Sequence, residues 1–162
     1  MWTNSDGLRI NIGVEEATLN KAGEYPDTIG NTRIVEVKVT PTGLALTPTL
    51  LDNFVSIPKG ARIERVVVVA NTAVTSGGAA VLNVGLRALD ATTAIDEDGL
   101  VAALALASIN AAGKTVDLVV GSTSAGALIG TTLSQAGLLY ADYDTAAYTA
   151  GDISVRVHFR IL

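Results

Sequence analysis

The chain has 162 residues, no cysteine and a formal net charge of −5, from 16 acidic and 11 basic residues. Its length fits a single domain with a substantial core, and the lack of cysteine excludes disulfides and thiolate metal sites. The acidic balance argues against a nucleic-acid binder, which normally presents a basic face.

Apolar residues make up 49% of the chain and charged residues only 17%. The longest apolar stretch, Leu100 to Ala107, is far shorter than the roughly 18 residues that a membrane span requires. The first residues, MWTNSDG, lack the basic residues and apolar core of a secretory signal. A small monomer with so few charges would expose large apolar patches. We therefore expect other copies of the chain, or another protein, to cover part of the surface, with an ordinary Ala-rich monomer as the alternative.

The N-terminal region combines one patterned and one unpatterned segment. Apolar residues alternate with polar ones at Leu8, Ile10, Ile12 and Val14, which predicts a half-buried strand. Residues 15–31 lack periodicity and are long for a connection in a compact domain. The sequence therefore predicts a first strand and an extended arm over residues 1–31, followed by the main domain over residues 32–162.

The rest of the chain predicts a series of short strands separated by turns. Strict alternation marks strands at 35–39 and 153–161, and the apolar run of Arg62 to Ala70 is typical of a central strand. A turn at residues 75–78 leads into a returning strand, Ala80 to Leu86, as either a hairpin or a crossing between sheets. Further strands are expected at residues 54–57, 116–120 and 138–143, with another candidate at 44–46.

About eight short strands spaced by turn residues favour an all-β fold, an antiparallel β-sandwich or jelly roll. One segment differs from this pattern. The Leu and Ala content of Gly99 to Ala107 favours a short helix, which Asp96 or Asp98 could cap. The sequence thus predicts one domain with at most one short helix.

The chain offers little catalytic chemistry. Its single histidine, His158, lies on the polar face of the last strand between Arg156 and Arg160. One histidine cannot form an imidazole metal cluster, and a catalytic role would need a nucleophile and an acid beside it. The acidic group around Asp96 and Asp98 could suggest calcium, but Ala105 stands where an EF-hand loop requires glutamate. A solvated turn with a helix cap is the simpler interpretation, and we expect no metal site, no cofactor and no enzymatic activity.

Two other segments have alternative interpretations. Tyr140 and Tyr143 lie near acidic residues, as in some carbohydrate-binding platforms, although tyrosines on a strand are more often packing or interface residues. The segment GSTSAGALIG, residues 121–130, is rich in Gly and Ser but lacks the GK[ST] ending of a phosphate-binding loop. We interpret it as a flexible connection between strands.

The most patterned part of the chain carries a family resemblance. The segment IPKGARIERVVVVANTAVTSGGAAVLNVGL, followed by ALDATTAIDEDGLVAALA, resembles small virion structural proteins of tailed bacteriophages. These proteins commonly show an IP-x-G-A-x-I turn, an A-x-L-N-V-G-L strand and a D-x-D-G-L stretch. The closing YTAGDISVRVHFRI is similar to their final strand. The resemblance covers about half of the chain, mainly residues 57–107 and 146–161.

The resemblance implies a non-enzymatic head decoration, or cement, protein. Such proteins tend to be homotrimeric β-sandwiches or jelly rolls on a capsid surface, which makes the major capsid protein the expected partner and the virion the expected location. We predict that residues 2–31 contribute to capsid or intersubunit contacts, with Trp2, Arg9 and Tyr25 as candidate contact residues. The alternative is a fibre- or tail-associated domain, or a carbohydrate-binding sandwich that uses Tyr140 and Tyr143.

Overall fold

The computed structural model describes residues 2–3, 9–10, 32–51 and 55–161. The chain forms two compact units, Met1–Asn31 and Thr32–Leu162. In the first unit, β1 (Trp2–Thr3) pairs antiparallel with β2 (Arg9–Ile10), so that Trp2 lies opposite Ile10. Of the strand predicted over residues 8–14, only Arg9 and Ile10 belong to the described part of the chain.

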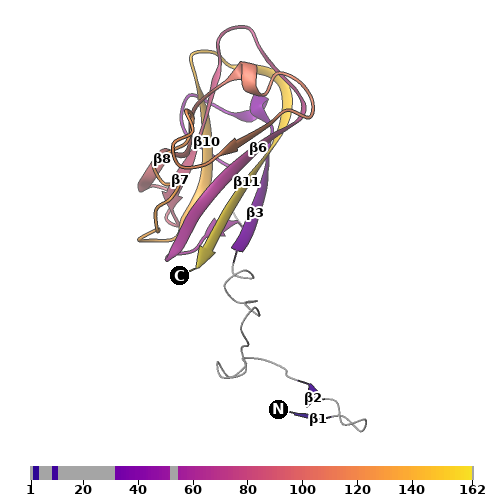
Figure 1. Ribbon diagram of the computed structural model, residues 1–162. Helices are drawn as coiled ribbons and strands as arrows, with labels where there is room; N and C mark the ends of the chain where they lie inside the picture. The colour runs from indigo at the N-terminus through magenta and orange to yellow at the C-terminus, as the bar shows by residue number, and fades with distance from the viewer. Residues whose placement is uncertain (1, 4–8, 11–31, 52–54, 162) are drawn as a thin grey trace. The chain divides into compact units, whose positions relative to one another are not determined.

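The second unit is a sandwich of two antiparallel sheets (Figure 1). The first sheet has the order β3-β11-β6-β9. It consists of β3 (Thr32–Val39), β11 (Tyr148–Ile161), β6 (Ala61–Ser76) and β9 (Thr115–Leu118). The predicted central strand is confirmed, because β6 pairs on one side with β11 and on the other with β9.

The second sheet has the order β4-β10-β7-β8, with β5 also paired to β10. It consists of β4 (Thr49–Leu50), β5 (Ser56–Ile57), β10 (Gly137–Asp144), β7 (Val81–Ala88) and β8 (Ala94–Ala105). Since β6 and β7 belong to different sheets, the turn at Gly77 and Gly78 is a crossing between sheets, not a hairpin.

This strand order is that of a jelly roll. When β4 and β5 are taken as two halves of one strand that both pair with β10, the eight strands in chain order lie as 1-8-3-6 in one sheet and 2-7-4-5 in the other. Each sheet therefore combines strands from both ends of the domain, as two Greek keys do. The predicted fold class, an all-β sandwich or jelly roll of about eight strands, is confirmed.

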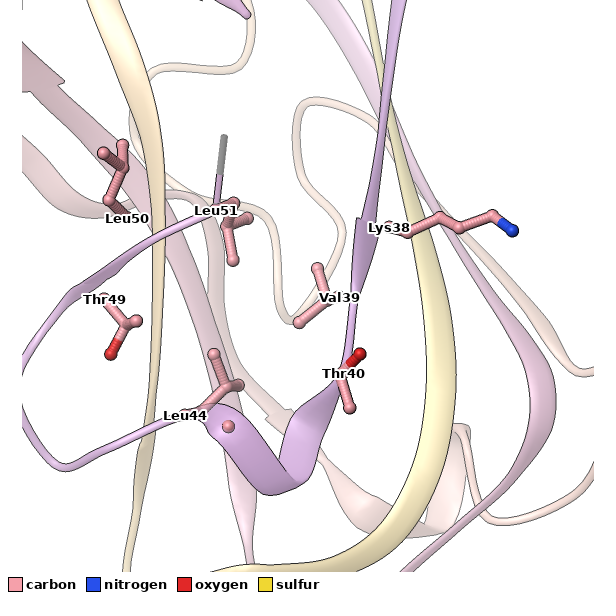
Figure 2. A pocket seen from close by; sticks show the side chains of 8 residues that line it. Lys38, Val39, Thr40, Leu44, Thr49, Leu50 and Leu51 are labelled. Atoms are coloured by element: carbon pink, nitrogen blue, oxygen red, sulfur yellow. The ribbon is translucent and has the colours of Figure 1, made fainter. Parts of the chain in front are cut away.

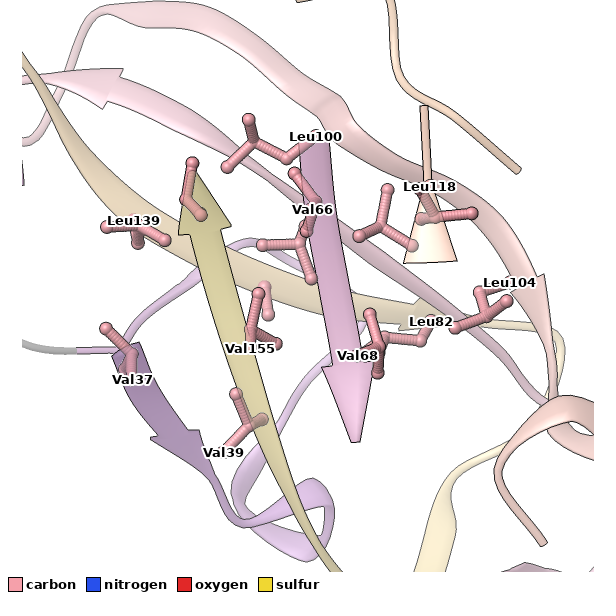
Figure 3. Close-up of a cluster of buried hydrophobic side chains, with 14 of the residues drawn as sticks. Val37, Val39, Val66, Val68, Leu82, Leu100, Leu104, Leu118, Leu139 and Val155 are labelled. Carbon is pink, nitrogen blue, oxygen red and sulfur yellow. The ribbon is translucent and has the colours of Figure 1, made fainter. Parts of the chain in front are cut away.

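The core lies between the two sheets and is aliphatic (Figure 3). Alternate residues of each strand point inward, among them Val66 and Val68 of β6, Val155 of β11, Leu82 of β7 and Leu139 of β10, all fully buried. Each such side chain contributes about 1.5–3 kcal/mol through removal from water. Many of the aliphatic side chains are thus buried between the two sheets of one sandwich.

The predicted helix over Gly99 to Ala107 is wrong. Residues up to Ala105 belong to β8, and only Leu106–Ser108 form a single 3-10 turn. Leu100, Val101 and Leu104 belong to the buried core, so tertiary packing overrides the helical propensity of the segment. Ala103 has a φ of 49°, outside the helical region. Asp96 and Asp98 accordingly lie within a strand and cap no helix.

Two smaller predictions also need correction. Residues 44–46 form no strand, because the 3-10 turn Pro41–Gly43 precedes them and pairing begins only at Thr49. The predicted flexible connection at residues 121–130 is hydrogen-bonded to both sheets. Its backbone bonds to β8 through Leu128 N to Gly99 O, 2.8 Å, and to β6 through Gly130 N to Ile63 O, 2.7 Å. No helix in the described residues is long and apolar enough to cross a membrane.

Candidate functional site

The outer face of the β3-β11-β6-β9 sheet carries an excess of basic side chains. Its strand register aligns outward-facing residues in rows, for example Glu36, Arg156, Val67 and Asp117 on four successive strands. We call this surface the basic face and define it by the following charged residues: Lys38, Arg62, Arg65, Arg156 and Arg160, with Glu36, Glu64, Asp117 and Asp152. Val67 is only 8% exposed on this face, as expected where long arginine side chains cover an apolar neighbour.

Ion pairs connect neighbouring strands across the basic face. Glu36 pairs with Arg156 at 3.1 Å, Arg65 with Asp117 at 3.2 Å, and Arg160 with Glu64 at 3.1 Å. The hydrogen bond from Arg156, followed by that from Ser154, lowers the pKa of Glu36 below its ordinary value. These pairs are partly exposed, so each contributes at most about 1 kcal/mol. Within the described residues, Lys38 and Arg62 take part in no ion pair.

His158 lies in the middle of the basic face, between Ile34 on β3 and Arg65 on β6. Burial, and then the positive charge of Arg65, lower the pKa of the imidazole. Its Nε2 atom is buried and has no hydrogen-bond partner in the described part of the chain. No nucleophile in the described part of the chain is therefore hydrogen-bonded to this nitrogen, as a catalytic triad would require.

The charged side chains on the outer face of the other sheet are mainly carboxylates. Asp142 and Asp144 of β10 lie on one side of Asn83 of β7, whose side-chain amide nitrogen donates to both, at 2.9 Å each. The Asn83 side-chain oxygen accepts a hydrogen bond of 2.8 Å from the backbone N–H of Ala103. Together with Asp96, Glu97 and Asp98 of β8, we call these carboxylates the acidic face. Asn83 is thus the polar centre that holds β7, β8 and β10 together there.

Burial, reinforced by neighbouring carboxylates, raises the pKa of two aspartates on this face. Burial, and then hydrogen bonding to and repulsion from Asp98, raise the pKa of Asp96. Burial also raises the pKa of Asp142, opposed by the hydrogen bond from Asn83 and reinforced by repulsion from Asp144, Glu97 and Asp98. Both carboxyl groups therefore bind a proton more readily than a carboxyl group in water.

Glycine allows the acidic face to form. A Cβ atom on Gly85 of β7 would lie 2.2 Å from the backbone of Asp96 and Glu97. The backbone of β8 thus passes directly over Gly85, in a region where the β7–β8 register is irregular. This crossing carries Asp96, Glu97 and Asp98 over the outer side of the sheet towards Asp142.

The two tyrosines of the proposed glycan platform do not form one surface. Tyr140 and Tyr143 are three residues apart on β10, which pairs regularly with β7, so their side chains point to opposite sides of the sheet. Tyr140 is 5% exposed, with the Arg87 guanidinium 5.1 Å from its ring centroid and its hydroxyl donating to Ala91 O at 3.4 Å. Tyr143 packs edge to face against Tyr148. Tyr140 is thus largely covered, and a role of the two tyrosines as a glycan platform stays a prediction.

The acidic side chains that the structure describes show no arrangement typical of calcium binding. Within the described residues, no group of three or more potential ligands could hold a metal ion. Asp90 is used within its own turn, where its carboxylate accepts hydrogen bonds from the backbone N–H groups of Thr92 and Thr93, at 2.9 Å each. These bonds lower the pKa of Asp90 to about 2.

A shallow hollow lies between the edges of β3 and β4 (Figure 2). Its volume is about 210 Å³, below the roughly 300–1,000 Å³ of typical ligand pockets. Val39, Leu44 and Leu51 point into it, whereas the side chain of Lys38 extends away from it. None of the described lining residues directs a charged group into the hollow, which lies at the edge of the sandwich.

The three candidate contact residues of the arm lie in the first unit. Trp2 belongs to β1 and Arg9 to β2, where the backbone of Arg9 lies opposite Thr3. Tyr25 lies outside the described residues. Their role in capsid or intersubunit contacts remains a prediction.

Sequence analysis alone missed the separation of charge between the two faces. The alternating Arg156, His158 and Arg160 and the cluster Asp96 to Asp98 were both visible as local patterns. Only the jelly-roll strand order places the first group on one sheet and the second on the other.

Comparison with known proteins identifies the fold. No protein-family model matches the chain, and no curated protein is detectably similar in sequence. The chain is similar in structure to chains of three solved phage capsid structures. A chain of the cyanophage Pam1 capsid asymmetric unit has a TM-score of 0.52 and 17% identity, over 99% of this chain and 98% of that one.

Chains of two other phage capsid structures are similar to this chain to the same degree. A chain of the capsid of Ralstonia phage GP4 has a TM-score of 0.52 and 15% identity, over 84% of this chain and 88% of that one. A chain of the acidic stable capsid structure of Helicobacter pylori bacteriophage KHP30 has a TM-score of 0.51 and 15% identity, over 80% of this chain and 86% of that one. The high coverage of both partners means that the chains are of similar length. At such identities the likeness establishes a common fold and not a common function.

Proposed function

We propose that this chain is a head decoration, or cement, protein of a tailed bacteriophage, which binds the assembled capsid as a homotrimer and stabilises it without catalysis. The observation that carries the proposal is the jelly-roll fold shared, over most of both chains, with chains of similar length in three phage capsid structures. The sequence resemblance of residues 57–107 and 146–161 to small virion proteins supports the same role independently.

The described surface suits a binding role. The hollow between β3 and β4 is small, and the charged residues are spread over two broad sheet faces. Broad surfaces with complementary charge fix the orientation and the partner of a protein contact. In the proposed role, the major capsid protein is the partner and the outside of the virion is the location.

Binding to the lattice explains how such a protein would stabilise a shell. A ligand that binds only the assembled state stabilises it by about 2.7 kcal/mol per site when its free concentration is a hundred times its Kd. In a homotrimer, three linked copies bind with a high effective concentration. The arm over residues 1–31, with Trp2, Arg9 and Tyr25, would extend each contact beyond the sandwich.

Heads assembled without this chain provide the test. Addition of the purified protein is expected to raise the temperature at which these heads break open, and deletion of residues 1–7 is expected to reduce the bound amount. The truncated chain should be checked for an unchanged melting temperature of the sandwich. Heads that break open at the same temperature with and without the protein would contradict the proposed function, and unchanged binding after the deletion would contradict the role of Trp2.

A further inference from the structure

We propose that the edge strand β3 of one copy is extended by the N-terminal arm of a second copy, with residues 8–14 of that arm added antiparallel to β3. The inference rests on the self-association contained in the proposed function and names one surface that forms it. In strand addition of this kind, backbone hydrogen bonds provide affinity and alternate side chains provide specificity.

Three of the four sheet edges of the sandwich are shielded within the described residues. β4 and β5 have two residues each, and β9 has four. The edge strand β8 has an irregular register with β7, and a loop covers it through Ala102 N to Ser124 O, 2.9 Å, and Leu128 N to Gly99 O, 2.8 Å. Short strands, irregular register and covering loops are common means of protecting sheet edges from further pairing.

The fourth edge, β3, has none of these three protections. Its eight residues pair with β11 in uninterrupted register, without a proline or a bulge. Every second residue of an antiparallel edge strand directs its N–H and C=O groups away from its partner. In the described part of the chain, β11 is the only strand paired with β3. The opposite side of β3 is therefore open to another strand.

The shallow hollow lies beside this open edge. Val39, Leu44 and Leu51 point into the hollow between the edges of β3 and β4 (Figure 2). Neighbouring strands lie about 4.8 Å apart, so a strand added to β3 would border the hollow. Aliphatic side chains on the core-facing side of that strand would cover these three residues.

The arm contains a segment with the required pattern. In residues 8–14, LRINIGV, every second residue is apolar, so a strand there has one apolar side. β3 alternates in the same way: Val37 and Val39 are buried, whereas Glu36 and Lys38 are exposed. The segment also matches β3 in length. Its apolar side would continue the core-facing row of β3, and its other side would continue the outer face.

A second copy is the source of the added strand. In the structure of a single chain, Arg9 and Ile10 pair with β1, and β3 retains its open edge. A strand that includes β2 can still pair with β3 of another molecule, because β1 occupies only one edge of β2. Residues 15–31, fully extended, span at most about 60 Å, so the arm is long enough to reach a neighbour. Three copies can therefore exchange arms in a closed ring.

Charge selects the register of the added strand. Two antiparallel registers set three apolar arm residues opposite the three core-facing valines of β3. One of them sets Arg9 directly opposite Lys38, which is unfavourable because like charges then face each other. The other sets Asn11 opposite Lys38. In this register the apolar pairs are Ile10 with Val39, Ile12 with Val37, and Val14 with Val35.

Disulfide formation between two different chains tests this register. The natural chain has no cysteine, so Asn11→Cys and Lys38→Cys are each the only thiol in their variant. The two variants are co-expressed as full-length chains, purified and oxidised, and peptide mass spectrometry counts the disulfides that join position 11 to position 38. The matched control pairs Asn11→Cys with Lys59→Cys, an exposed turn residue. At least about tenfold more mixed disulfide is expected for position 38, since a disulfide needs Cα atoms within about 7 Å.

One pair of charge substitutions tests the apolar side of the added strand. Ile12→Asp and Asn11→Asp each introduce a carboxylate at neighbouring positions, but only Ile12 would face the core side. Ile12→Asp is expected to raise the dissociation constant of the oligomer at least about tenfold, because a charge loses its water there. Asn11→Asp should bind as tightly as the unmodified chain or tighter, beside Lys38. Sedimentation velocity gives the dissociation constants, and circular dichroism reports whether each variant is folded.

Two results would overturn the inference. One is a mixed disulfide at position 38 that is no more abundant than the control at position 59. The other is the same dissociation constant for Ile12→Asp and Asn11→Asp in folded chains. Either result can occur while the unmodified protein still binds and stabilises heads, so failure of the arm exchange is distinguishable from failure of the decoration role.

Discussion

The two outer faces of the sandwich belong to the same jelly roll but differ in the groups that surround their charged side chains. On the basic face, regular strand pairing sets Glu36 beside Arg156 and Asp117 beside Arg65, so that most charges find an opposite charge. On the acidic face, an irregular β8 brings carboxylates together over a buried amide, Asn83. The ion pairs of the basic face thus bridge neighbouring strands directly, whereas two carboxylates of the acidic face share one neutral amide as their donor.

The largest expected effect comes from the glycine beneath the irregular strand. Gly85→Ala would place a Cβ atom 2.2 Å from the backbone of Asp96 and Glu97. Because backbone cannot move aside easily, we expect a loss of about 3 kcal/mol or more in the free energy of unfolding, measured by urea denaturation. Gly43→Ala is the matched control, because nothing lies within 4 Å of its added Cβ. Equal stability of the two variants would show that β8 does not cross Gly85 closely.

The amide that organises the acidic face gives the next largest effect. Asn83→Ala removes the donor to Asp142 and Asp144 and the acceptor for the backbone of Ala103. Since Asp142 is 8% exposed, its carboxylate loses a hydrogen bond that water replaces poorly, and we expect a loss of about 2–3 kcal/mol by thermal or urea unfolding. Asn71→Ala, which removes a more exposed bond to Ser154, should cost less. A loss below about 0.5 kcal/mol for Asn83→Ala would contradict the central role of this amide.

The dependence of stability on pH should have opposite sign on the two faces. The pKa values of Asp96 and Asp142 are raised, so their contribution to stability is present below the unfolded pKa of about 4 and is lost as the pH rises through their folded pKa. The pKa of Glu36 is lowered, so its contribution is present above the unfolded value and is lost as the pH falls through the folded pKa.

One substitution on each face measures this contrast. Asp98→Asn removes the repulsion on Asp96 and should stabilise the protein at pH 7, by less than about 1 kcal/mol, with no gain near pH 3. Asp117→Asn makes the same change in net charge but breaks the pair with Arg65, and should destabilise slightly at pH 7. Urea unfolding between pH 3 and pH 8 gives both values. An equal increase in the free energy of unfolding for both variants would mean that the change in stability depends on net charge alone.

The smallest expected effect is the coupling across the basic face. A double-mutant cycle of Glu36→Gln and Arg156→Gln should give a coupling free energy of about 0.5 kcal/mol, because both side chains are well exposed. High salt should reduce this coupling. A coupling above about 2 kcal/mol would mean that the pair is shielded from water far more than the structure indicates.

The regular parts of the fold could be predicted from sequence, because they depend on local alternation. Val155 and Val157 point inward while Arg156 and His158 point outward, as the period of the last strand requires. The apolar run of β6 likewise predicts a strand paired on both sides. These elements, and the jelly roll that they form, follow from side-chain patterns within each strand.

The irregular parts could not be predicted, because they depend on contacts far apart in the sequence. The segment from Gly99 to Ala105 is a strand since residues 124–128 bond to it and its leucines pack into the core. The separation of charge depends on which strands share a sheet, and Tyr140 is covered by Arg87 from the neighbouring strand. In each case, contacts with residues distant in the sequence determine the structure that the segment or side chain adopts, and local propensity does not.

The most direct test of the account is a binding isotherm on assembled heads that lack this chain, set against unassembled capsid subunits at the same concentration. The account predicts saturable binding to the heads with copy numbers in multiples of three, and no binding to the free subunits. Equal binding to heads and free subunits, or no binding to heads, would contradict it.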